Sequence, residues 1–426
     1  MTPDLSFPRR IHVVGIGGAG MSAIATVLVG MGHRVSGSDL RASPGLERLR
    51  ALGVDVHVGH DPAHGADAEL VTVSTAVPRD NPEVTSARDR GASVFTRAEM
   101  LAAITRQRRT AAVAGTHAKT TTSSMLALIL LETGLRPSFV IGGDLNEIGT
   151  GAAWSDGEWL VVEADESDGT FLELDTQLAL VTSLEPDHLD HYGSYAALTE
   201  AFDRFLEGAT ETRIVCADQP DLWKLARRRA IGYGLNEESE YRIAALELAP
   251  TGSRFELTRH GAVAARVALS VPGAHNAANA AAAATAALEM GLGPDAVGSG
   301  LGRFTGVARR YQFRGEAGGV AYVDDYAHLP GEVRVALDTA RRSGRTRVVC
   351  VFQPHRFTRT ASLWQDFGTA FAGADLLVVT DVYGNGEPPI PGVSGKLVVD
   401  AVMEADPGRA VADLPGRLEL ASYLRA

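Results

Sequence analysis

The sequence predicts an α/β protein of three consecutive units, each built around a mostly parallel sheet. Short apolar segments alternate with helix-like segments along all 426 residues, which is typical of parallel strands joined by crossover helices. Several apolar segments run directly into a glycine-rich or polar loop. A chain of this length corresponds to two to four domains at roughly 100–200 residues each. We place the divisions at residues 1–107, 108–310 and 311–426.

The first unit opens with an expected strand at residues 11–15 and an apolar helix at residues 21–30, and further strands are expected at residues 34–37, 54–58, 70–74 and 93–95. The segment between the first strand and the helix, Gly15-Ile-Gly-Gly-Ala-Gly20, matches the G-x-G-x-x-G pattern of a diphosphate-binding turn. Asp39 follows where such folds bind a ribose hydroxyl. The unit is therefore predicted to be Rossmann-like. A nicotinamide or flavin site and a turn without any ligand are the alternatives.

The second unit begins with an expected strand at residues 111–114 and a helix at residues 123–131. The segment between them, Gly115-Thr-His-Ala-Lys-Thr-Thr-Thr122, has the layout of a phosphate-binding loop. Backbone N–H groups at a helix N-terminus favour anions, the lysine binds β/γ-phosphates and the next hydroxyl binds Mg²⁺. Val113 and Ala118 stand where the usual pattern has glycine. We predict a phosphate-loop ATPase-like parallel sheet that binds a nucleoside triphosphate.

Later segments of the second unit add two buried strands and an Ala-rich helix. The strands are expected at residues 159–163 and 178–184, a more hydrophilic insertion has strands near 241–248 and 254–257, and the helix covers residues 277–287. Glu163 ends the first of these strands, a position from which an acidic residue helps to hold Mg²⁺. Asp165, Glu166 and Asp168 follow, and a solvated acidic loop is the alternative. His188 lies among carboxylates after the next strand, which favours metal or phosphate contact over a structural role.

The third unit repeats the alternation, with strands expected at residues 320–323, 347–352 and 375–380. We predict a second Rossmann-like sheet. In open α/β sheets ligands bind beyond the carboxyl ends of the strands. His355, Arg356 and Arg359 follow one of these strands, and arginine forks suit carboxylates. An anionic-substrate site is favoured over a surface basic cluster.

The composition excludes several classes of function. Apolar residues make up 45% and charged residues 22% of the chain, as in ordinary globular proteins. The net charge of −12 argues against a general nucleic-acid-binding surface. The two cysteines, Cys216 and Cys350, are far apart and form no disulfide framework, which indicates the cytoplasm. No signal peptide is evident, and the Ala-rich run is too short and polar to span a membrane.

Taken together, the motifs resemble the Mur ligase family, and within it the branch that adds L-alanine to UDP-N-acetylmuramate. The matching segments run through nearly the whole chain in one order: residues 15–22, 35–39, 115–122, 163–168, 185–190, 275–279, 309–310, 324–328, 353–360, 381–383 and 386–387. Each segment alone is weak, but the ordered set is highly specific.

The resemblance implies domains that bind the UDP-sugar, ATP and the amino acid, in that order. It also implies the reaction. The lactyl carboxylate of UDP-N-acetylmuramate attacks the γ-phosphate of ATP, and the amine of L-alanine displaces phosphate from the resulting acyl phosphate. Catalysis of this kind is mainly positioning and electrostatics. Mg²⁺ is the implied metal ion, and the implied oligomeric state is a monomer or weak homodimer. Closure of the domains is expected because their ligands must meet.

The resemblance also assigns roles to individual residues. The implied catalytic residues are Lys119, Glu163, His188, His355 and Arg356. The implied ATP site comprises Gly115, Thr116, His117, Ala118, Lys119, Thr120, Thr121, Asn279, Arg310 and Asp325. The implied metal ligands are Thr120, Glu163 and His188. The implied UDP-sugar site comprises Gly15, Gly17, Gly18, Ala19, Gly20, Ser38, Asp39 and Ser74. The implied amino-acid site comprises His355, Arg356 and Arg359. For Asn279, helix capping is an adequate alternative.

Two positions depart from the family pattern. Ala118 stands where the family usually has glycine, and Leu329 where it usually has a second histidine. Alanine adopts a positive φ only at a cost, so Ala118 would weaken ATP binding if the loop needs that conformation. The alternatives are a ligase that recycles murein peptide onto the same UDP-sugar, a catalytically impaired homologue, and an NAD-dependent oxidoreductase.

Overall fold

The computed structural model describes residues 3–425, which divide into two compact units. The first unit contains the residues up to 247 together with 254–271 and 276–308. The second contains residues 248–253, 272–275 and those from 309 onward. Each unit is described by itself. The N-terminal and central sheets lie together in the first unit, so the predicted division near residue 107 separates two sheets of one compact body.

The N-terminal sheet has five parallel strands in the order β3-β2-β1-β4-β5. Its strands are β1 (Arg10–Val14), β2 (Arg34–Asp39), β3 (Asp55–Val58), β4 (Leu70–Val73) and β5 (Ser93–Thr96). The order reverses between β1 and β4. In open α/β sheets such a switch point is where ligands bind, beyond the carboxyl ends of the strands. The Rossmann-like prediction for this unit is confirmed.

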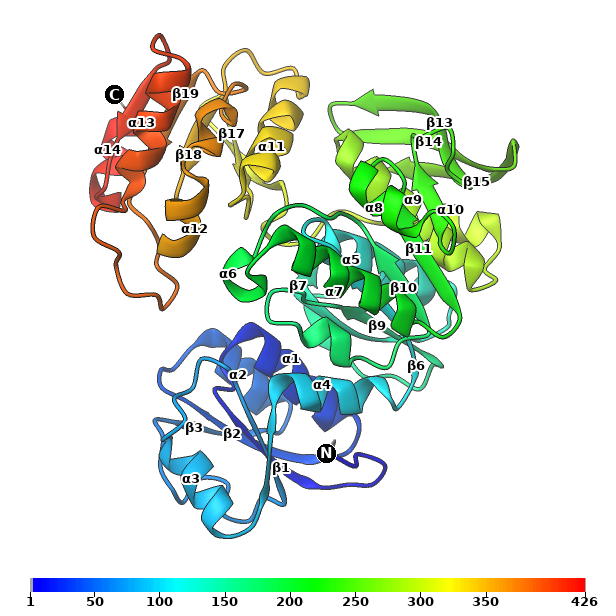
Figure 1. The fold of residues 1–426 in the computed structure, drawn as a ribbon, viewed down its shortest axis with the longest axis vertical. Coiled ribbons are helices and arrows are strands. Elements are labelled where there is room, and N and C mark those ends of the chain that lie inside the picture. Colours follow the sequence, from blue (N-terminus) through cyan, green and yellow to red (C-terminus); the bar gives the residue numbers. More distant parts are fainter. Residues whose placement is uncertain (1–2, 426) are drawn as a thin grey trace. The chain divides into compact units, whose positions relative to one another are not determined.

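Helices cover both faces of this sheet (Figure 1), with α3 on one side and α1, α2 and α4 on the other. They are α1 (Ala19–Gly30), α2 (Pro44–Ala51), α3 (Pro82–Asp89) and α4 (Arg97–Thr105). Ile24, Leu46 and Met100 belong to one buried cluster, and Val84 and Ala87 belong to another with Val14. Burial on both faces explains why β1 is apolar after Arg10 at every position except His12, which is itself buried.

The central sheet has ten strands in the order β15-β14-β13-β12-β11-β10-β6-β9-β7-β8. The strands are β6 (Arg109–Ala114), β7 (Ser138–Leu145), β8 (Thr150–Ala153), β9 (Trp159–Glu163), β10 (Leu178–Val181), β11 (Thr212–Cys216), β12 (Ile231–Gly234), β13 (Tyr241–Ala249), β14 (Gly252–Arg259) and β15 (Ala262–Leu269). β6 pairs in parallel with β10 and β9, which places it inside the sheet. The loops after β6, β9 and β10 therefore leave the same edge side by side.

Helices and short helical turns connect the strands of the central sheet. They are α5 (Lys119–Glu132), η1 (Thr170–Glu173), α6 (Leu189–Tyr192), α7 (Tyr195–Gly208), α8 (Pro220–Ala226), α9 (Ala274–Glu289) and α10 (Pro294–Gly302). α5 is buried from Thr120 to Leu130, and the alanines of α9 from 280 to 284 are fully buried. Small side chains let the α9 backbone approach its neighbours closely. The predicted Ala-rich helix is thus a core element.

The second unit contains a parallel sheet in the order β18-β19-β20 and an antiparallel hairpin of β16 and β17. The strands are β16 (Gln312–Ala317), β17 (Val320–Asp324), β18 (Val349–Phe352), β19 (Leu376–Val379) and β20 (Val411–Asp413). The helices are α11 (Pro330–Arg342), α12 (Phe357–Leu363), η2 (Asp366–Thr369), α13 (Gly395–Ala405) and α14 (Arg417–Arg425). Phe352, Phe367 and Phe371 form the aromatic centre of its core. The three parallel strands confirm the predicted fold class, but the strand expected at residues 320–323 is β17, which belongs to the antiparallel hairpin and not to the parallel sheet.

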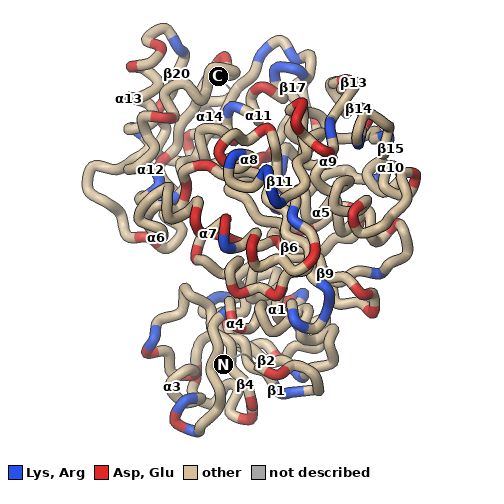
Figure 2. Tube along the Cα trace, turned by 45° about the vertical axis from the view of Figure 1, so that its right-hand side comes forward, with Lys and Arg blue, Asp and Glu red and all other residues tan. Residues whose placement is uncertain are grey.

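Charged residues of both signs are interspersed along the trace (Figure 2). In the described part of the chain, no helix is both long and apolar enough to cross a membrane.

Candidate active site

The central site is formed by three loops at the carboxyl edge of the central sheet. We call residues 115–119 the phosphate loop and residues 163–168 the acidic loop; they follow β6 and β9. Residues 182–188 follow β10. Since β6 lies between β9 and β10, the predicted residues Lys119, Glu163 and His188 leave neighbouring strands at one edge.

Gly115 is required by close packing against the loop after β10. Its φ is +137°, and an added Cβ would lie 2.1 Å from Thr182 Oγ1 and 2.9 Å from the Ser183 nitrogen. Thr116 N–H donates to the Ser183 carbonyl at 3.2 Å, and His117 N–H donates to Ser183 Oγ at 2.8 Å. These contacts hold the phosphate loop in one shape before any ligand binds.

Ala118 adopts the left-handed conformation, which alanine reaches only at an energetic cost. It is the N-cap residue of α5, with φ 66° and ψ −2°. An L-residue in this region is strained by contact of its Cβ with its own backbone. The departure from glycine at this position therefore carries a conformational cost.

Lys119 is held in a buried ion pair. Its Nζ donates to Glu166 Oε1 at 2.9 Å and to the Gly115 carbonyl at 2.6 Å. The Glu166 side chain is fully buried and that of Lys119 is 15% exposed. Burial raises the pKa of Glu166 to about 7 even though Lys119 opposes this. Sequence reasoning assigned Glu166 no role beyond its place in the acidic loop.

Thr120 and Glu163 offer the kind of oxygen ligands that Mg²⁺ prefers. Thr120 Oγ1 donates to Glu163 Oε1 at 2.9 Å, and Gly142 N–H donates to Glu163 Oε2 at 2.6 Å. A hydroxyl and a carboxylate are hard oxygen ligands, and Mg²⁺ usually takes one or two carboxylates and completes its shell with water and phosphate. These two residues therefore fit the predicted ion.

His188 lies close to the Lys119–Glu166 pair. Its Nε2 is 3.2 Å from Asp187 Oδ2 and 3.8 Å from Glu166 Oε1. Within the described residues, no group of three or more His, Cys, Asp or Glu side chains is arranged to hold a metal ion. A role for His188 in binding a second ion stays a prediction.

Two further predicted nucleotide residues of the first unit, Thr121 and Asn279, are buried. Thr121 follows Thr120 on the first turn of α5, and Asn279 lies on α9; both are less than 9% exposed. His117 places Nε2 3.1 Å from Glu185 Oε2 in the loop after β10. The contact of Asn279 with adenine stays a prediction.

A second candidate site lies at the switch point of the N-terminal sheet. We call residues 15–20 the glycine loop. Gly15 N–H donates to the Ser38 carbonyl at 2.9 Å, and Gly17 N–H donates to Asp39 Oδ2 at 2.9 Å. An added Cβ on Gly15 would lie 3.0 Å from the Ser74 Cβ. The structure thus brings together the predicted UDP-sugar residues Gly15, Gly17, Gly18, Ala19, Gly20, Ser38, Asp39 and Ser74.

The predicted amino-acid residues cluster in the second unit. Arg359 Nη1 lies 3.1 Å from His355 Nδ1, and Arg356 Nε lies 2.9 Å from Glu387 Oε1. Burial, with His328 and the two arginines, lowers the pKa of His355 to about 4, so its ring is neutral near pH 7. Tyr383 lies beside the His355 ring, with centroids 5.7 Å apart. Sequence reasoning assigned no role to Glu387 or Tyr383, although both lie in quoted motif segments.

Arg310, Asp325 and Leu329 also belong to the second unit. Arg310 Nη1 lies 3.8 Å from Glu332 Oε1. Asp325 accepts N–H bonds from Tyr311 at 2.7 Å and from Ala327, and burial raises its pKa. Leu329 is buried as the N-cap of α11. The predicted contacts of Arg310 and Asp325 with the nucleotide stay predictions.

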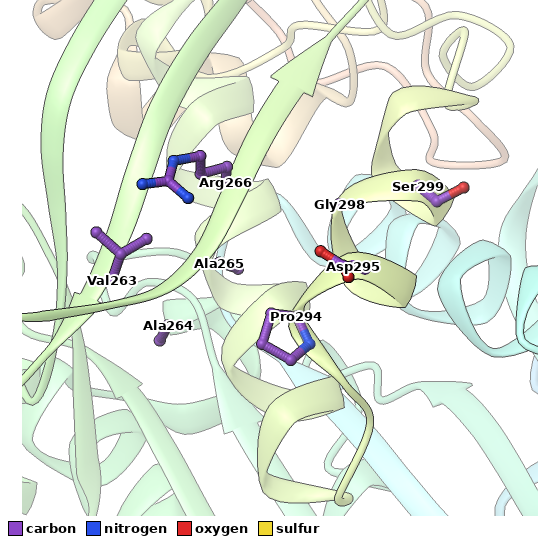
Figure 3. Close-up of a pocket in the computed structure, with 8 residues that line it drawn as sticks. All are labelled: Val263, Ala264, Ala265, Arg266, Pro294, Asp295, Gly298 and Ser299. Atoms are coloured by element: carbon purple, nitrogen blue, oxygen red, sulfur yellow. The ribbon is translucent and has the colours of Figure 1, made fainter.

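A pocket of about 270 Å³ between β15 and α10 contains none of the predicted residues. Val263 and Arg266 line it from β15, and Asp295 and Ser299 from α10 (Figure 3). Arg266 already pairs with Glu256 at 3.1 Å, so this pocket is not a candidate active site.

In the central sheet, the phosphate loop with its lysine follows one strand, and the neighbouring strand ends in an acidic residue. This arrangement defines a nucleotide-binding α/β protein. Three family models match the chain in order: Mur ligase family, catalytic domain, at residues 10–109; Mur ligase middle domain at residues 113–287; and Mur ligase, glutamate ligase domain, at residues 309–425.

Similar proteins agree with these matches. A UDP-N-acetylmuramate–L-alanine ligase of Pelotomaculum thermopropionicum is 44% identical, over 98% of this chain and 91% of its own length. One of Bradyrhizobium diazoefficiens is also 44% identical, over 99% and 93%. The crystal structure of a UDP-N-acetylmuramate–alanine ligase from Thermotoga maritima has a TM-score of 0.83 at 28% identity, covering 97% of this chain and 92% of that one. The chain belongs to the Mur ligase family, and this membership replaces the oxidoreductase alternative.

Proposed function

We propose that this chain is the ATP-dependent ligase that joins L-alanine to the lactyl carboxylate of UDP-N-acetylmuramate through an acyl phosphate. The observation that carries the proposal is the phosphate loop, with Lys119 beside Glu166 and Thr120 beside Glu163. Relatives named for this reaction align with 98–99% of the chain. The proposal includes action in the cytoplasm as a monomer or weak homodimer.

The central site supplies positioning and charge. Backbone N–H groups of the phosphate loop at the start of α5 would bind the phosphates of ATP, and Lys119 would exchange its contact with Glu166 for the β/γ-phosphates. Thr120 and Glu163 would hold Mg²⁺. When bound, this ion neutralises charge on the transferred phosphoryl group.

The remaining two sites would bind the other two substrates, UDP-N-acetylmuramate and L-alanine. The glycine loop would take the diphosphate of UDP-N-acetylmuramate, because backbone N–H groups at the N-terminus of α1 favour an anion. Arg359 and the neutral His355 would bind the alanine carboxylate and the reacting carbonyl, while Glu387 fixes Arg356 by its ion pair.

The test is phosphate release with UDP-N-acetylmuramate, ATP and Mg²⁺, with either L-alanine or the murein tripeptide added. We expect release that depends on the UDP-sugar and on L-alanine. Release with the tripeptide alone would identify the recycling reaction instead. If no phosphate is released with either L-alanine or the tripeptide, the protein is a catalytically impaired homologue.

A further inference from the structure

A buried carboxylate lies directly behind the glycine loop. It belongs to Glu83, on the first turn of α3, and its side chain is fully buried. Ser38 Oγ donates a hydrogen bond to Glu83 Oε2 at 2.5 Å, and the Asp61 N–H donates to Oε1 at 3.3 Å.

Three imidazoles surround this carboxylate. His64 Nδ1 lies 2.8 Å from Oε1, and His60 Nδ1 lies 3.1 Å from Oε2. His12 Nε2 lies 3.6 Å from Oε2, beyond hydrogen-bond range but within ion-pair range. Across the described residues, all ion-pair partners of Glu83 are histidines.

Glu83 is an anion in the folded protein. Burial by itself would raise its pKa, but the contacts from His12, Ser38 and His64 outweigh burial and hold the pKa at about 2. A buried anion needs a nearby positive charge or several donors. Here the Ser38 hydroxyl and the Asp61 N–H donate to the carboxylate, and the three imidazoles face it.

Ser38 connects this cluster to the glycine loop. It is fully buried at the carboxyl end of β2. Its hydroxyl is bonded to Glu83, while its carbonyl accepts the N–H groups of Gly15 at 2.9 Å and of Ile16 at 3.0 Å. A shift of Ser38 would therefore move the start of the glycine loop.

We propose that Glu83 is a positioning residue for the UDP-sugar. Held by His12, His60 and His64, it fixes Ser38 and, through the Ser38 carbonyl, the glycine loop that receives the diphosphate. The inference rests on the proposed function of that loop. Its contacts all lie within the N-terminal sheet and its loops, so the phosphate loop is not part of the cluster.

Glu83→Gln is the main test. The glutamine amide has nearly the same shape as the carboxylate, but its NH₂ group replaces one accepting oxygen and would face groups that donate hydrogen bonds, such as the Ser38 hydroxyl and the Asp61 N–H. The Kd for UDP and the KM for UDP-N-acetylmuramate should rise roughly tenfold, as expected for losing a hydrogen bond to a charged group. The kcat at saturation and the KM values for ATP and L-alanine should stay within about twofold. Glu83→Asp should recover part of the loss.

Glu69→Gln is the matched control. Glu69 is an exposed carboxylate of the same domain, and it accepts the Arg10 N–H at the start of β1, the end opposite the glycine loop. This variant should bind UDP like the wild type. Thermal unfolding of all variants is measured in parallel.

A second variant, Ser38→Ala, tests the connection itself. If Glu83 acts through Ser38, Glu83→Gln should add little to the rise in KM already caused by Ser38→Ala. The proposal would be overturned if the effects of Ser38→Ala and Glu83→Gln on KM were additive. It would also be overturned if Glu83→Gln left the UDP affinity unchanged, or if that variant impaired every kinetic constant equally. A wild-type protein that binds no UDP would instead overturn the proposed function of the glycine loop.

Discussion

At the scale of single residues, Ala118 is the clearest conflict between side chain and backbone. The phosphate loop turns into α5 through a left-handed residue, and glycine adopts this region far more readily than alanine. The strain amounts to about 1 kcal/mol. The contacts of Gly115, Thr116 and His117 with the loop after β10 fix the neighbouring residues and leave Ala118 little freedom to relax.

Ala118→Gly should relieve this strain and lower the KM for ATP by up to roughly fivefold, the equivalent of about 1 kcal/mol. The measurement is ATP-dependent phosphate release at saturating UDP-sugar and L-alanine. Ala127→Gly is the matched control, because Ala127 lies in the interior of α5, where glycine destabilises by about 0.5–1 kcal/mol. An unchanged or raised KM in Ala118→Gly would show that the loop accommodates alanine.

Lys119→Ala should abolish turnover, by roughly a thousandfold or more, because the charge that faces the phosphates is lost. Binding of UDP should stay nearly intact, since the glycine loop lies on a different sheet. The exposed Lys224 of α8 provides the control substitution to alanine. A kcat like that of the wild type would refute the role of the phosphate loop.

At the scale of elements, β9 and α5 show what local sequence does and does not predict. β9 has the expected bounds, whereas α5 begins at Lys119 and was expected only from residue 123. The residues from Thr120 to Ser124 are hydroxyl-bearing yet buried, so α5 shows no apolar stripe at its start. A helix that is buried on all sides loses the periodic signal on which such predictions depend.

The candidate site was predictable in part for a related reason. Lys119 and Thr120 begin the helix that follows β6, and Glu163 ends β9, so local sequence locates them. The pair of Lys119 with Glu166 joins loops that are 47 residues apart and depends on β9 being the neighbour of β6. The Glu83 cluster likewise combines residues from β1, β2, α3 and the loop between β3 and β4. The order of strands, which sequence pattern alone does not specify, creates both.

Glu166→Gln should change how stability depends on pH. The folded-state pKa of Glu166, about 7, lies above the ordinary 4.5, so the folded protein binds more protons than the unfolded chain between these values. The wild type therefore loses stability as pH rises through this window, by about 2 kcal/mol or less. Denaturant unfolding across the window should show a steeper fall for the wild type than for Glu166→Gln. Parallel curves would show that Glu166 ionises normally.

At the scale of the whole molecule, Arg97 connects the N-terminal sheet to the acidic loop within the first compact unit. It begins α4, and its Nη2 lies 2.9 Å from Asp168 Oδ2 and 3.6 Å from Asp165 Oδ2. An added Cβ on Gly20 would lie 3.3 Å from Arg97 Nη1. One side chain thus touches the elements that would carry the UDP-sugar and the metal ion.

Arg97→Ala should lower the free energy of unfolding by about 1 kcal/mol, since a partly buried, charge-assisted hydrogen bond is lost. Burial raises the pKa of Asp168, but the contacts from Thr170 and Arg97 outweigh it and lower the pKa below the ordinary 3.8. The contribution is therefore present above that pH and disappears as pH falls below it. Denaturant unfolding of Arg97→Ala, with the exposed Arg88→Ala of α3 as control, should show a deficit near pH 7 that shrinks in acid. A deficit that persists unchanged in acid would mean that Arg97 stabilises the fold by packing and not through Asp168.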